Sequence, residues 1–554
     1  ECIIPFIIAN LVNEIKAGCS IGTIAYYGII LVVMAALSLT FGALAGSACA
    51  TASCGFARNL RKDMFYKIQD YSFENIDKFS VSSLVTRMTT DVTNVQMAYM
   101  FTIRLLARAP IMIVMSLIMT VTISPAIAFM MLITIPVLGG LLIFIAKKAH
   151  PHFIKVFDEY DVLNNSVQEN VNASRVVKAF VREDYEIDKF HIISKYVYSL
   201  FTKAEKIVAW NSPVMQFTMY VVILVIVAIG GNSIVTGTMQ TGELTSIIVY
   251  SLQILMSLMM VTFVFVMIMI AEASTDRIAE VLNEEPEMQV SDDAVKDVAN
   301  GEIIFDHVNF SYAGKDGTLS LKDVCLHIQS GQTIGIIGGT GSAKSTLVQL
   351  IPRLYDVTGG AVKVGGVDVR SYDLDTLRNN VAMVLQKNEL FSGTIADNLR
   401  WGNPDATDAE IVDACKQACA DEFIERFPDK YQTHIEQGGN NVSGGQKQRL
   451  CIARALLKKP RILILDDSTS AVDTATDAKI RHSFAEKIPG TTVFIIAQRI
   501  SSVENADKVL VLDNGRVSGF DTPANLLKNN AIYQDVYNSQ TKGSGDFDEK
   551  GGEA

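Results

Sequence analysis

A glycine-rich loop is the first segment of this chain whose residue types suggest chemistry. Residues 333–337 form an apolar run typical of a strand, and a helical pattern begins at Leu347. Glycines between these elements let backbone N–H groups surround phosphate oxygens, while Lys344 can reach the β and γ phosphates and the Ser345 hydroxyl can bind Mg²⁺. We therefore expect the loop to bind a nucleoside triphosphate. Its residues are Gly338, Gly339, Thr340, Gly341, Ser342, Ala343, Lys344, Ser345 and Thr346.

Ala343 occupies a position at which such loops usually have glycine. The alanine costs little if its backbone is helical, but it is strained if its φ angle is positive. We expect the nucleotide to bind despite this change. The alternative, a glycine-rich turn without a ligand, is disfavoured by the motifs that follow.

Two adjacent carboxylates end a second apolar strand, residues 462–465. Asp466 is suited to hold Mg²⁺ through water, and Asp467 stands where a general base would take a proton from an attacking water. The alternative, an aspartate that only caps the next helix, is weakened by the phosphate-binding loop in the same domain.

Residues 442–449 open a helix at which Ser443 is a plausible N-cap. Its glycines permit close approach of another molecule, so this is a second helix N-terminus suited to phosphate. Two such sites in one domain are unusual for an enzyme that acts alone. The residues of this signature segment are Ser443, Gly444, Gly445 and Gln446.

The elements around these motifs divide the chain into a membrane part and a soluble part. Five apolar segments are long enough to cross a bilayer, and residues 3–12 resemble the end of a sixth, truncated span. Long basic connections over residues 58–87 and 147–206 are predicted to be cytoplasmic and helical. The five segments are 22–50, 107–123, 126–146, 213–236 and 244–271.

The soluble part alternates β-type and helical runs, which predicts an α/β domain with a largely parallel sheet. We assign a membrane domain to 1–280, a linker to 281–300, the soluble domain to 301–538 and a disordered tail to 539–554. The expected strands are 302–305, 333–337, 462–465, 492–496 and 508–512.

Charge and cysteine content limit the possible partners. The net charge of −11 comes entirely from residues 281–554, and such an acidic domain is a poor partner for nucleic acid. The eight cysteines are scattered along the chain, which predicts free thiols in a reducing compartment.

The spans and motifs together resemble a half-transporter of the ABC exporter superfamily, and the resemblance covers nearly the whole chain. It implies a B-family (type IV) fold, in which a six-helix all-α membrane domain is fused to a P-loop ATPase domain. It also implies ATP and Mg²⁺ as cofactors, with two ATP molecules held between two ATPase domains. The resemblance also implies an integral membrane protein of the bacterial inner membrane, with its ATPase domain and termini in the cytoplasm.

The same resemblance assigns further roles. Tyr312 matches the aromatic residue that stacks on adenine, and Gln386 matches the glutamine that touches Mg²⁺ with Ser345 and Asp466. Asp473 matches the loop between the two ATP sites, and Ser443 to Gln446 would face the ATP of a partner chain. Residues 73–86 and 171–180 resemble the two cytoplasmic coupling segments, and 436–440 the cross-talk loop.

Two positions depart from the family pattern, which has Glu at 467 and His at 498. Asp467 is one methylene shorter and sets its carboxylate back by roughly 1–1.5 Å, and an error of about 1 Å can cost on the order of 100-fold in rate. Gln498 can donate a hydrogen bond but cannot carry a proton. We therefore expect the degenerate subunit of a heterodimeric, multidrug-type exporter with a non-identical partner. A homodimer with tolerated substitutions is the alternative.

The substrate is left open by the sequence. Five methionines in the last span suit promiscuous apolar ligands, although they can equally be ordinary packing residues. Amphipathic drug-like molecules or lipids are the expected substrates, and a non-transporting regulator of a channel is a further alternative. The methionines are Met256, Met259, Met260, Met267 and Met269.

Overall fold

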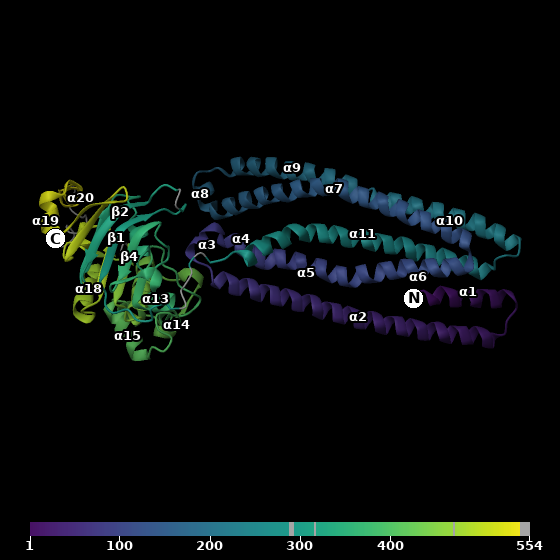
Figure 1. Ribbon diagram of the computed structural model, residues 1–554, viewed down its shortest axis with the longest axis horizontal. Helices are drawn as coiled ribbons and strands as arrows, with labels where there is room; N and C mark the ends of the chain where they lie inside the picture. Colours follow the sequence, from purple (N-terminus) through teal and green to yellow (C-terminus); the bar gives the residue numbers. More distant parts are fainter. Residues whose placement is uncertain (287, 289–292, 315–316, 469–470, 543–554) are drawn as a thin grey trace. The chain divides into compact units, whose positions relative to one another are not determined.

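The computed structural model describes residues 1–286, 288, 293–314, 317–468 and 471–542 (Figure 1). The chain forms two compact units. Glu1–Asp70 and Phe79–Glu284 make a helical unit, whereas Tyr71–Lys78 and Glu285–Ala554 make an α/β unit. The last helix of the first unit ends at Asn283, so residues 281–283, expected in the linker, are helical.

The helical unit contains five helical stretches long and apolar enough to cross a membrane, which confirms the five predicted spans. α1 has 14 residues and packs on the start of α11, where Asn13 Oδ1 accepts a hydrogen bond from the Gly242 N–H at 2.8 Å. The helices are α1 (Ile3–Lys16), α2 (Ile21–Gln69), α4 (Val81–Thr86), α5 (Val92–Phe101), α6 (Ala107–Ile123), α7 (Pro125–Asn172), α8 (Ser174–Ala179), α9 (Glu183–Val208), α10 (Asn211–Val235) and α11 (Thr241–Asn283), with π-helical turns η1 (Arg87–Asp91) and η2 (Thr102–Leu106).

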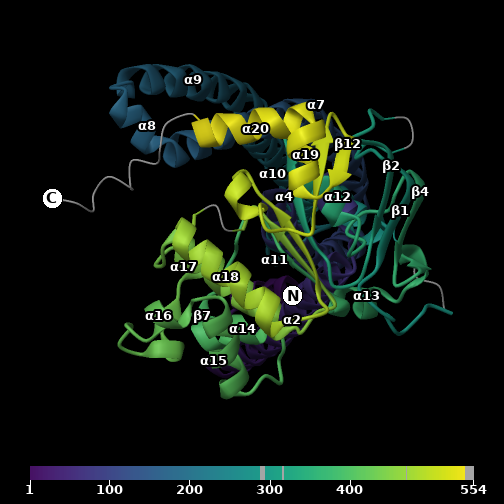
Figure 2. The ribbon, with the colours of Figure 1, turned by 90° about the vertical axis from the view of Figure 1, so that its left-hand side faces the viewer.

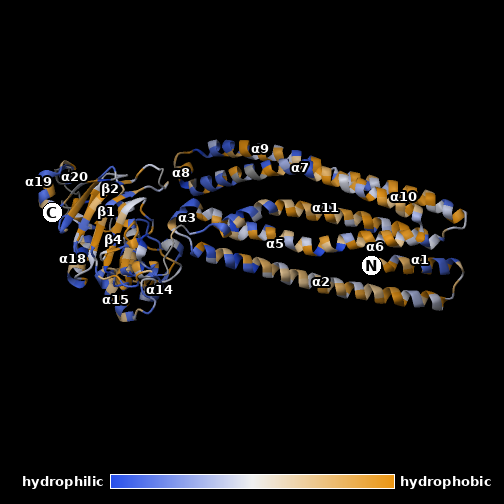
Figure 3. Ribbon diagram, viewed as in Figure 1, coloured by the Kyte–Doolittle hydropathy of each residue, from blue (hydrophilic) through white to orange (hydrophobic). Residues whose placement is uncertain are grey.

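Several helices extend well beyond the length that a bilayer requires. α2 has 49 residues and α7 has 48, against about 20 for a single span. Figure 3 shows both helices changing from hydrophobic to hydrophilic residues along their length. Each helix is therefore longer than one span requires, and its assignment as a cytoplasmic extension stays a prediction.

A buried carboxylate joins η1 to α11 in the polar part of the helical unit. Asp91 has a fully buried side chain and accepts hydrogen bonds from Arg277 Nε at 2.8 Å and from Ser274 Oγ at 2.9 Å. One turn further along α11, Glu280 forms an ion pair with Arg87 at 2.8 Å. Since a buried charge needs its partners, this cluster fixes the lateral position of α11.

We expect Asp91→Ala to lower the free energy of unfolding of the helical unit by on the order of 2 kcal/mol, because Arg277 and Ser274 lose a charged acceptor. Thermal unfolding of the detergent-solubilised protein measures the change. The exposed pair between Lys189 and Glu169 provides a control, and Glu169→Gln should have a much smaller effect because solvent screens this pair. Equal shifts for both variants would contradict the role of Asp91.

The core of the α/β unit is a six-stranded sheet in the order β12-β11-β3-β10-β9-β6. All neighbouring pairs are parallel except β11 and β12, so the predicted, largely parallel sheet is confirmed. The strands are β3 (Thr333–Gly338), β6 (Val381–Val384), β9 (Ile462–Asp466), β10 (Thr492–Ile496), β11 (Lys508–Asp513) and β12 (Arg516–Asp521).

Residues 302–305, one of the expected strands, lie outside this sheet. They fall largely within β1 (Ile303–Phe310), which lies in a separate antiparallel sheet in the order β2-β1-β4-β5. The other strands are β2 (Leu321–Ile328), β4 (Gly359–Val364) and β5 (Val367–Asp368), with a small pair β7 (Gly393–Thr394) and β8 (His434–Ile435).

Helices of the α/β unit pack around both sheets. α19 and α20 lie beside β12 in Figure 2, and α20 continues to Lys542. Residues 539–542, expected in the disordered tail, are therefore helical, and 543–554 lie outside the described residues. The helices are α3 (Phe73–Lys78), α12 (Lys344–Gln349), α13 (Leu374–Asn380), α14 (Ile395–Arg400), α15 (Asp408–Gln417), α16 (Asp421–Ile424), α17 (Gly444–Leu457), α18 (Thr474–Lys487), α19 (Pro523–Asn529) and α20 (Ala531–Lys542), with 3-10 turns η3 (Val369–Ser371), η4 (Lys430–Gln432), η5 (Gln437–Gly439) and η6 (Ile500–Ser502).

Candidate functional site

The glycine-rich loop lies at the carboxyl end of β3, between β11 and β10, and α12 begins at Lys344. The loop thus has the strand and helix that the sequence predicts. A Cβ atom added to Gly338 would lie 2.3 Å from the Leu512 carbonyl oxygen, so this position requires glycine. A Cβ atom on Gly339 or Gly341 would meet nothing within 4 Å, so the rest of the loop is open to a ligand.

Ala343 has φ +69° and ψ 31°, a left-handed conformation that strains alanine because of its Cβ atom. Its methyl group packs against the hydrophobic core behind the loop. Of the two backbone conformations considered from the sequence, Ala343 therefore adopts the strained one. Its extra methyl group contacts the hydrophobic core.

The structure brings two of the three predicted Mg²⁺ ligands, Ser345 and Asp466, together. Ser345 Oγ donates to Asp466 Oδ1 at 3.0 Å, and Lys344 Nζ donates to the carbonyl oxygens of Gly338 and Gly339 at 2.8 and 2.9 Å. Burial raises the pKa of Asp466. Burial also lowers the pKa of Lys344, and the charges of Asp466 and Asp467 oppose that lowering. The adjacent hydroxyl and carboxylate offer the oxygen donors that Mg²⁺ prefers.

A buried polar atom also fits a phosphate at this loop. Ser342 Oγ is buried and has no hydrogen-bond partner among the described residues. A hydroxyl in this state costs free energy unless a ligand supplies a partner. The residues present therefore fit a nucleotide with Mg²⁺.

The two unusual residues of the sequence contact each other. Gln498 Nε2 donates to Asp467 Oδ2 at 2.8 Å, and Asp467 has a positive φ of 48°. Burial raises the pKa of Asp467, whereas the hydrogen bond from Gln498, the charge of Lys344 and a hydrogen bond from Gln386 oppose this rise. The base position, the switch position and Gln386 thus form one cluster around a single carboxylate.

The signature segment begins α17 as predicted. Ser443 Oγ accepts from the Gln446 N–H at 3.3 Å, and Gln446 Oε1 accepts from the Ser443 N–H at 2.9 Å, so the two residues form a reciprocal cap. Gln448 of the same helix accepts from the Ala471 N–H at 3.0 Å. Asp473 caps α18 by accepting from the Thr476 N–H at 2.9 Å, and Ser470 lies outside the described residues. The signature helix therefore contacts the segment that leads into α18.

Tyr312 lies beside the phosphate-binding loop. Its hydroxyl donates to Thr346 Oγ1 at 3.1 Å, and its half-exposed ring makes an edge contact with Tyr355. Tyr355 in turn donates to Asp77 of α3 at 2.7 Å, and Phe73 of α3 contacts its ring. The sequence did not single out Tyr355, because nothing in its local pattern indicates a partner almost 280 positions away. Residues of α3, which belong to the first predicted coupling segment, are thus connected through Tyr355 to Tyr312, the residue expected to stack on adenine.

Residues that the sequence analysis missed hold the backbone after Gln498. The side chain of Gln540 in α20 accepts from the Ile500 N–H and donates to the Gln498 carbonyl oxygen, both at 2.8 Å. On the other side, Arg481 of α18 donates to the Ser501 carbonyl oxygen at 2.9 Å and pairs with Asp477 at 3.1 Å. The two contacts fix this segment, which we call the switch segment (residues 498–502).

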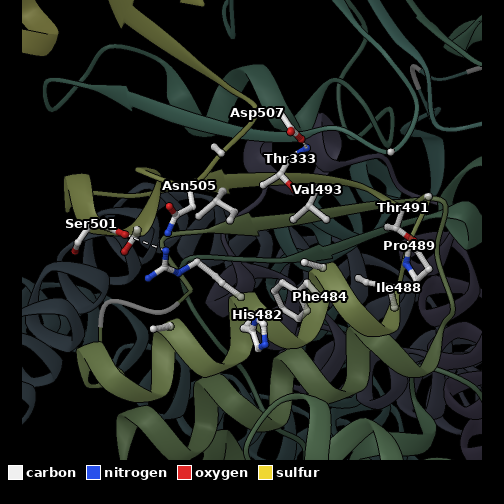
Figure 4. Close-up of a pocket in the computed structure, with 18 of the residues that line it drawn as sticks. Thr333, His482, Phe484, Ile488, Pro489, Thr491, Val493, Ser501, Asn505 and Asp507 are labelled. Carbon is white, nitrogen blue, oxygen red and sulfur yellow. Dashed lines mark hydrogen bonds between the residues drawn. The ribbon is translucent and has the colours of Figure 1, made fainter. Parts of the chain in front are cut away.

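A pocket of about 810 Å³ adjoins the switch segment (Figure 4). It lies between α18 and residues of β3 and β10. Ser501 and Asn505 lie at one end of it, and Ile488 and Thr491 at the other. The pocket faces away from the phosphate-binding loop, because Thr333 and Val493 are at the opposite ends of their strands.

We expect Ala343→Gly to raise the free energy of unfolding of the α/β unit by about 0.5–1 kcal/mol, because glycine removes the left-handed strain. The affinity for ATP should change less than about threefold, since the methyl group contacts the core. Chemical denaturation and nucleotide titration measure the two effects. Gly341→Ala is the reverse control: its φ is +81° and its surroundings are open, so it should destabilise through strain alone.

We expect Gln540→Ala to accelerate hydrogen exchange of the Ile500 amide by about fivefold, since that amide loses a hydrogen bond worth about 1 kcal/mol. Exchange followed by mass spectrometry measures this change. Gln534→Ala is the control, because the side-chain amide of Gln534 in α20 donates to backbone carbonyl oxygens of α19 and not to the switch segment. Unchanged exchange in the Gln540 variant would show that α20 does not hold this segment.

Comparisons with known proteins agree with this architecture. The family described as "ABC transporter transmembrane region" matches residues 1–258, and the family described as "ABC transporter" matches residues 321–470. YfiB of Bacillus subtilis, an uncharacterised ABC transporter ATP-binding protein, is 36% identical over 98% of this chain and 94% of its own length. Rv1273c of Mycobacterium tuberculosis, described in the same words, is 35% identical over 97% and 93%.

A solved structure has the same fold. The structure of a bacterial Atm1-family ABC exporter with ATP bound superimposes with a TM-score of 0.87 and 22% identity, over 97% of this chain and 95% of that one.

Proposed function

The chain belongs to the ABC transporter family, and from this premise we propose that it is the degenerate half of a heterodimeric exporter. It has half-transporter architecture, in an integral membrane protein with a cytoplasmic ATPase domain. In the proposed role it binds ATP, hydrolyses it slowly at its own site and supplies its signature helix to a partner's site.

The hydrogen bond between Gln498 and Asp467 carries this proposal. A general base needs a free oxygen aimed at the attacking water. Asp467 is shorter than the family's Glu, and one of its oxygens is already held by an amide that cannot accept or release a proton. Both departures thus weaken the same step of hydrolysis.

The residues that hold the nucleotide are present on this chain. Bound Mg²⁺ would be held by Ser345, Gln386 and Asp466, and it would neutralise charge on the phosphates. In this proposal Lys344 leaves the loop carbonyls to bind the β and γ phosphates, and adenine stacks on the Tyr312 ring. ATP is therefore bound tightly and released slowly at this site.

The intact cap of Ser443 and Gln446 supports the second half of the proposal. It leaves the N-terminus of α17 preorganised, with backbone N–H groups available to the γ-phosphate of a partner's ATP. Hydrolysis would thus occur at the site in which the partner supplies Glu and His.

Exposed side chains of α11 support an amphipathic substrate, drug-like or lipid. Met256 and Met259 are more than half exposed in the helical unit, and methionine adapts to apolar ligands of varied shape. We propose that transport is outward, because this chain shares its fold with the exporter structure.

The double variant Asp467→Glu with Gln498→His should raise the ATPase rate of the purified chain by at least about tenfold, because it restores a base of full length and a titratable partner. Steady-state phosphate release measures the rate. Lys344→Ala in the same background should abolish the gain, which assigns it to this loop.

Turnover of tens of ATP per second by the unmodified chain alone would contradict the proposal. Co-purification of two differently tagged copies that transport by themselves would indicate a homodimer instead. ATP-dependent change in a channel current without substrate movement would indicate a regulator.

A further inference from the structure

Two neighbouring β-bulges occur where β1 and β2 pair. Phe305 pairs with Leu326, Val308 with Val324 and Phe310 with Leu321, so each strand contains extra residues between paired positions. His307 in β1 has φ 48° and Asp323 in β2 has φ 51°, values that are uncommon for residues other than glycine. Bulges of this kind redirect side chains, and strained backbone often marks a functional position.

The bulges bring three different donor groups together on the exposed face of this sheet. His307 Nδ1 lies 2.7 Å from Asp323 Oδ1 and 3.4 Å from Cys325 Sγ, and the three donor atoms all lie within 4.8 Å of one another. Asn309 Oδ1 accepts from the Asp323 N–H at 2.9 Å and holds the second bulge in place. The cluster is thus built by backbone geometry as well as by its ion pair.

Two of these separations are within about 0.6 Å of those in a tetrahedral zinc site, and the third, sulfur to oxygen, is within 4.8 Å. Zinc binds nitrogen and oxygen at about 2.0–2.2 Å and thiolate sulfur at about 2.3 Å, so its ligand atoms lie roughly 3.3–3.6 Å apart. The sulfur–nitrogen separation already fits. The nitrogen–oxygen separation needs to open by about 0.6 Å, which a rotation of exposed side chains provides.

A second pair, between β2 and the residue just before β1, shows what an ordinary ion pair looks like here. His327 Nε2 lies 2.7 Å from Glu302 Oε1, and the described residues near it include no third donor of this kind. An imidazole–carboxylate contact alone therefore does not explain why a thiol joins the first cluster.

We infer that His307, Asp323 and Cys325 form a binding site for Zn²⁺, with water as the fourth ligand. Binding releases the thiol proton of Cys325, and the proton of the imidazole when it is charged, to solvent. The metal ties β1 to β2, and β1 ends two residues before Tyr312. The inference is independent of the proposed function, because the cluster contains none of the residues assigned to ATP.

Cobalt(II) is a suitable probe, because thiolate binding gives it a near-ultraviolet absorption that Zn²⁺ abolishes by displacement. We expect the full-length, nucleotide-free chain in detergent to bind Co²⁺ with this absorption. Cys325→Ser should remove the absorption. His307→Asn should weaken binding by at least about tenfold. Asparagine tolerates the left-handed backbone, so the bulge is preserved.

His327→Asn and Cys54→Ser are matched controls, since they remove an imidazole on the neighbouring strand β2 and another exposed thiol. Both should bind Co²⁺ as the unmodified chain does. As a second measurement, Zn²⁺ should slow alkylation of Cys325 but not of Cys54. Equal binding by the unmodified chain and Cys325→Ser, or alkylation of Cys325 that zinc does not affect, would overturn the inference.

Discussion

The parallel pairing of β9, β10 and β3 is the constraint on which the nucleotide site depends. Ile496 lies opposite Asp466 on one side and Ile336 on the other, so β9 and β10 end together and β3 ends two residues later, at Gly338. The segments that follow them contain the phosphate-binding loop, Asp467 and Gln498, which therefore meet at one edge of the sheet. A shift of one residue in any of these pairings would turn the relevant side chains to the opposite face.

Much of this arrangement could be predicted from the sequence, because strand, loop and helix are contiguous there. The phosphate-binding loop, the cap of Ser443 and the apolar spans each follow from residues close to one another in the chain. The sheet that contains β1 could not be assigned in the same way. An apolar run indicates a strand but does not indicate which strand pairs with it, so the strand expected at 302–305 could not be assigned to its antiparallel sheet.

Contacts between distant residues were also beyond the sequence. Gln540 reaches Gln498 from a helix that the sequence analysis partly assigned to a disordered tail, and Tyr355 reaches Asp77 of α3 across the fold. In each case the residue type is common on protein surfaces, and only the backbone path makes it a partner. The conformation of Ala343 could be predicted only in part. The sequence indicated that an alanine replaces the usual glycine, but only the φ angle of the structure shows that the backbone there is left-handed.

The position of Gln540 has a practical consequence for anyone who engineers this protein. The residue lies in the last turn of α20, so cutting the chain back before it would delete the hydrogen bonds to the Gln498 carbonyl and the Ile500 amide while leaving every motif intact. Shortened versions and versions with affinity tags fused near this helix would then differ in nucleotide turnover for reasons unrelated to their catalytic residues. Enzymology of the transporter is therefore best compared among chains with identical carboxyl-terminal segments.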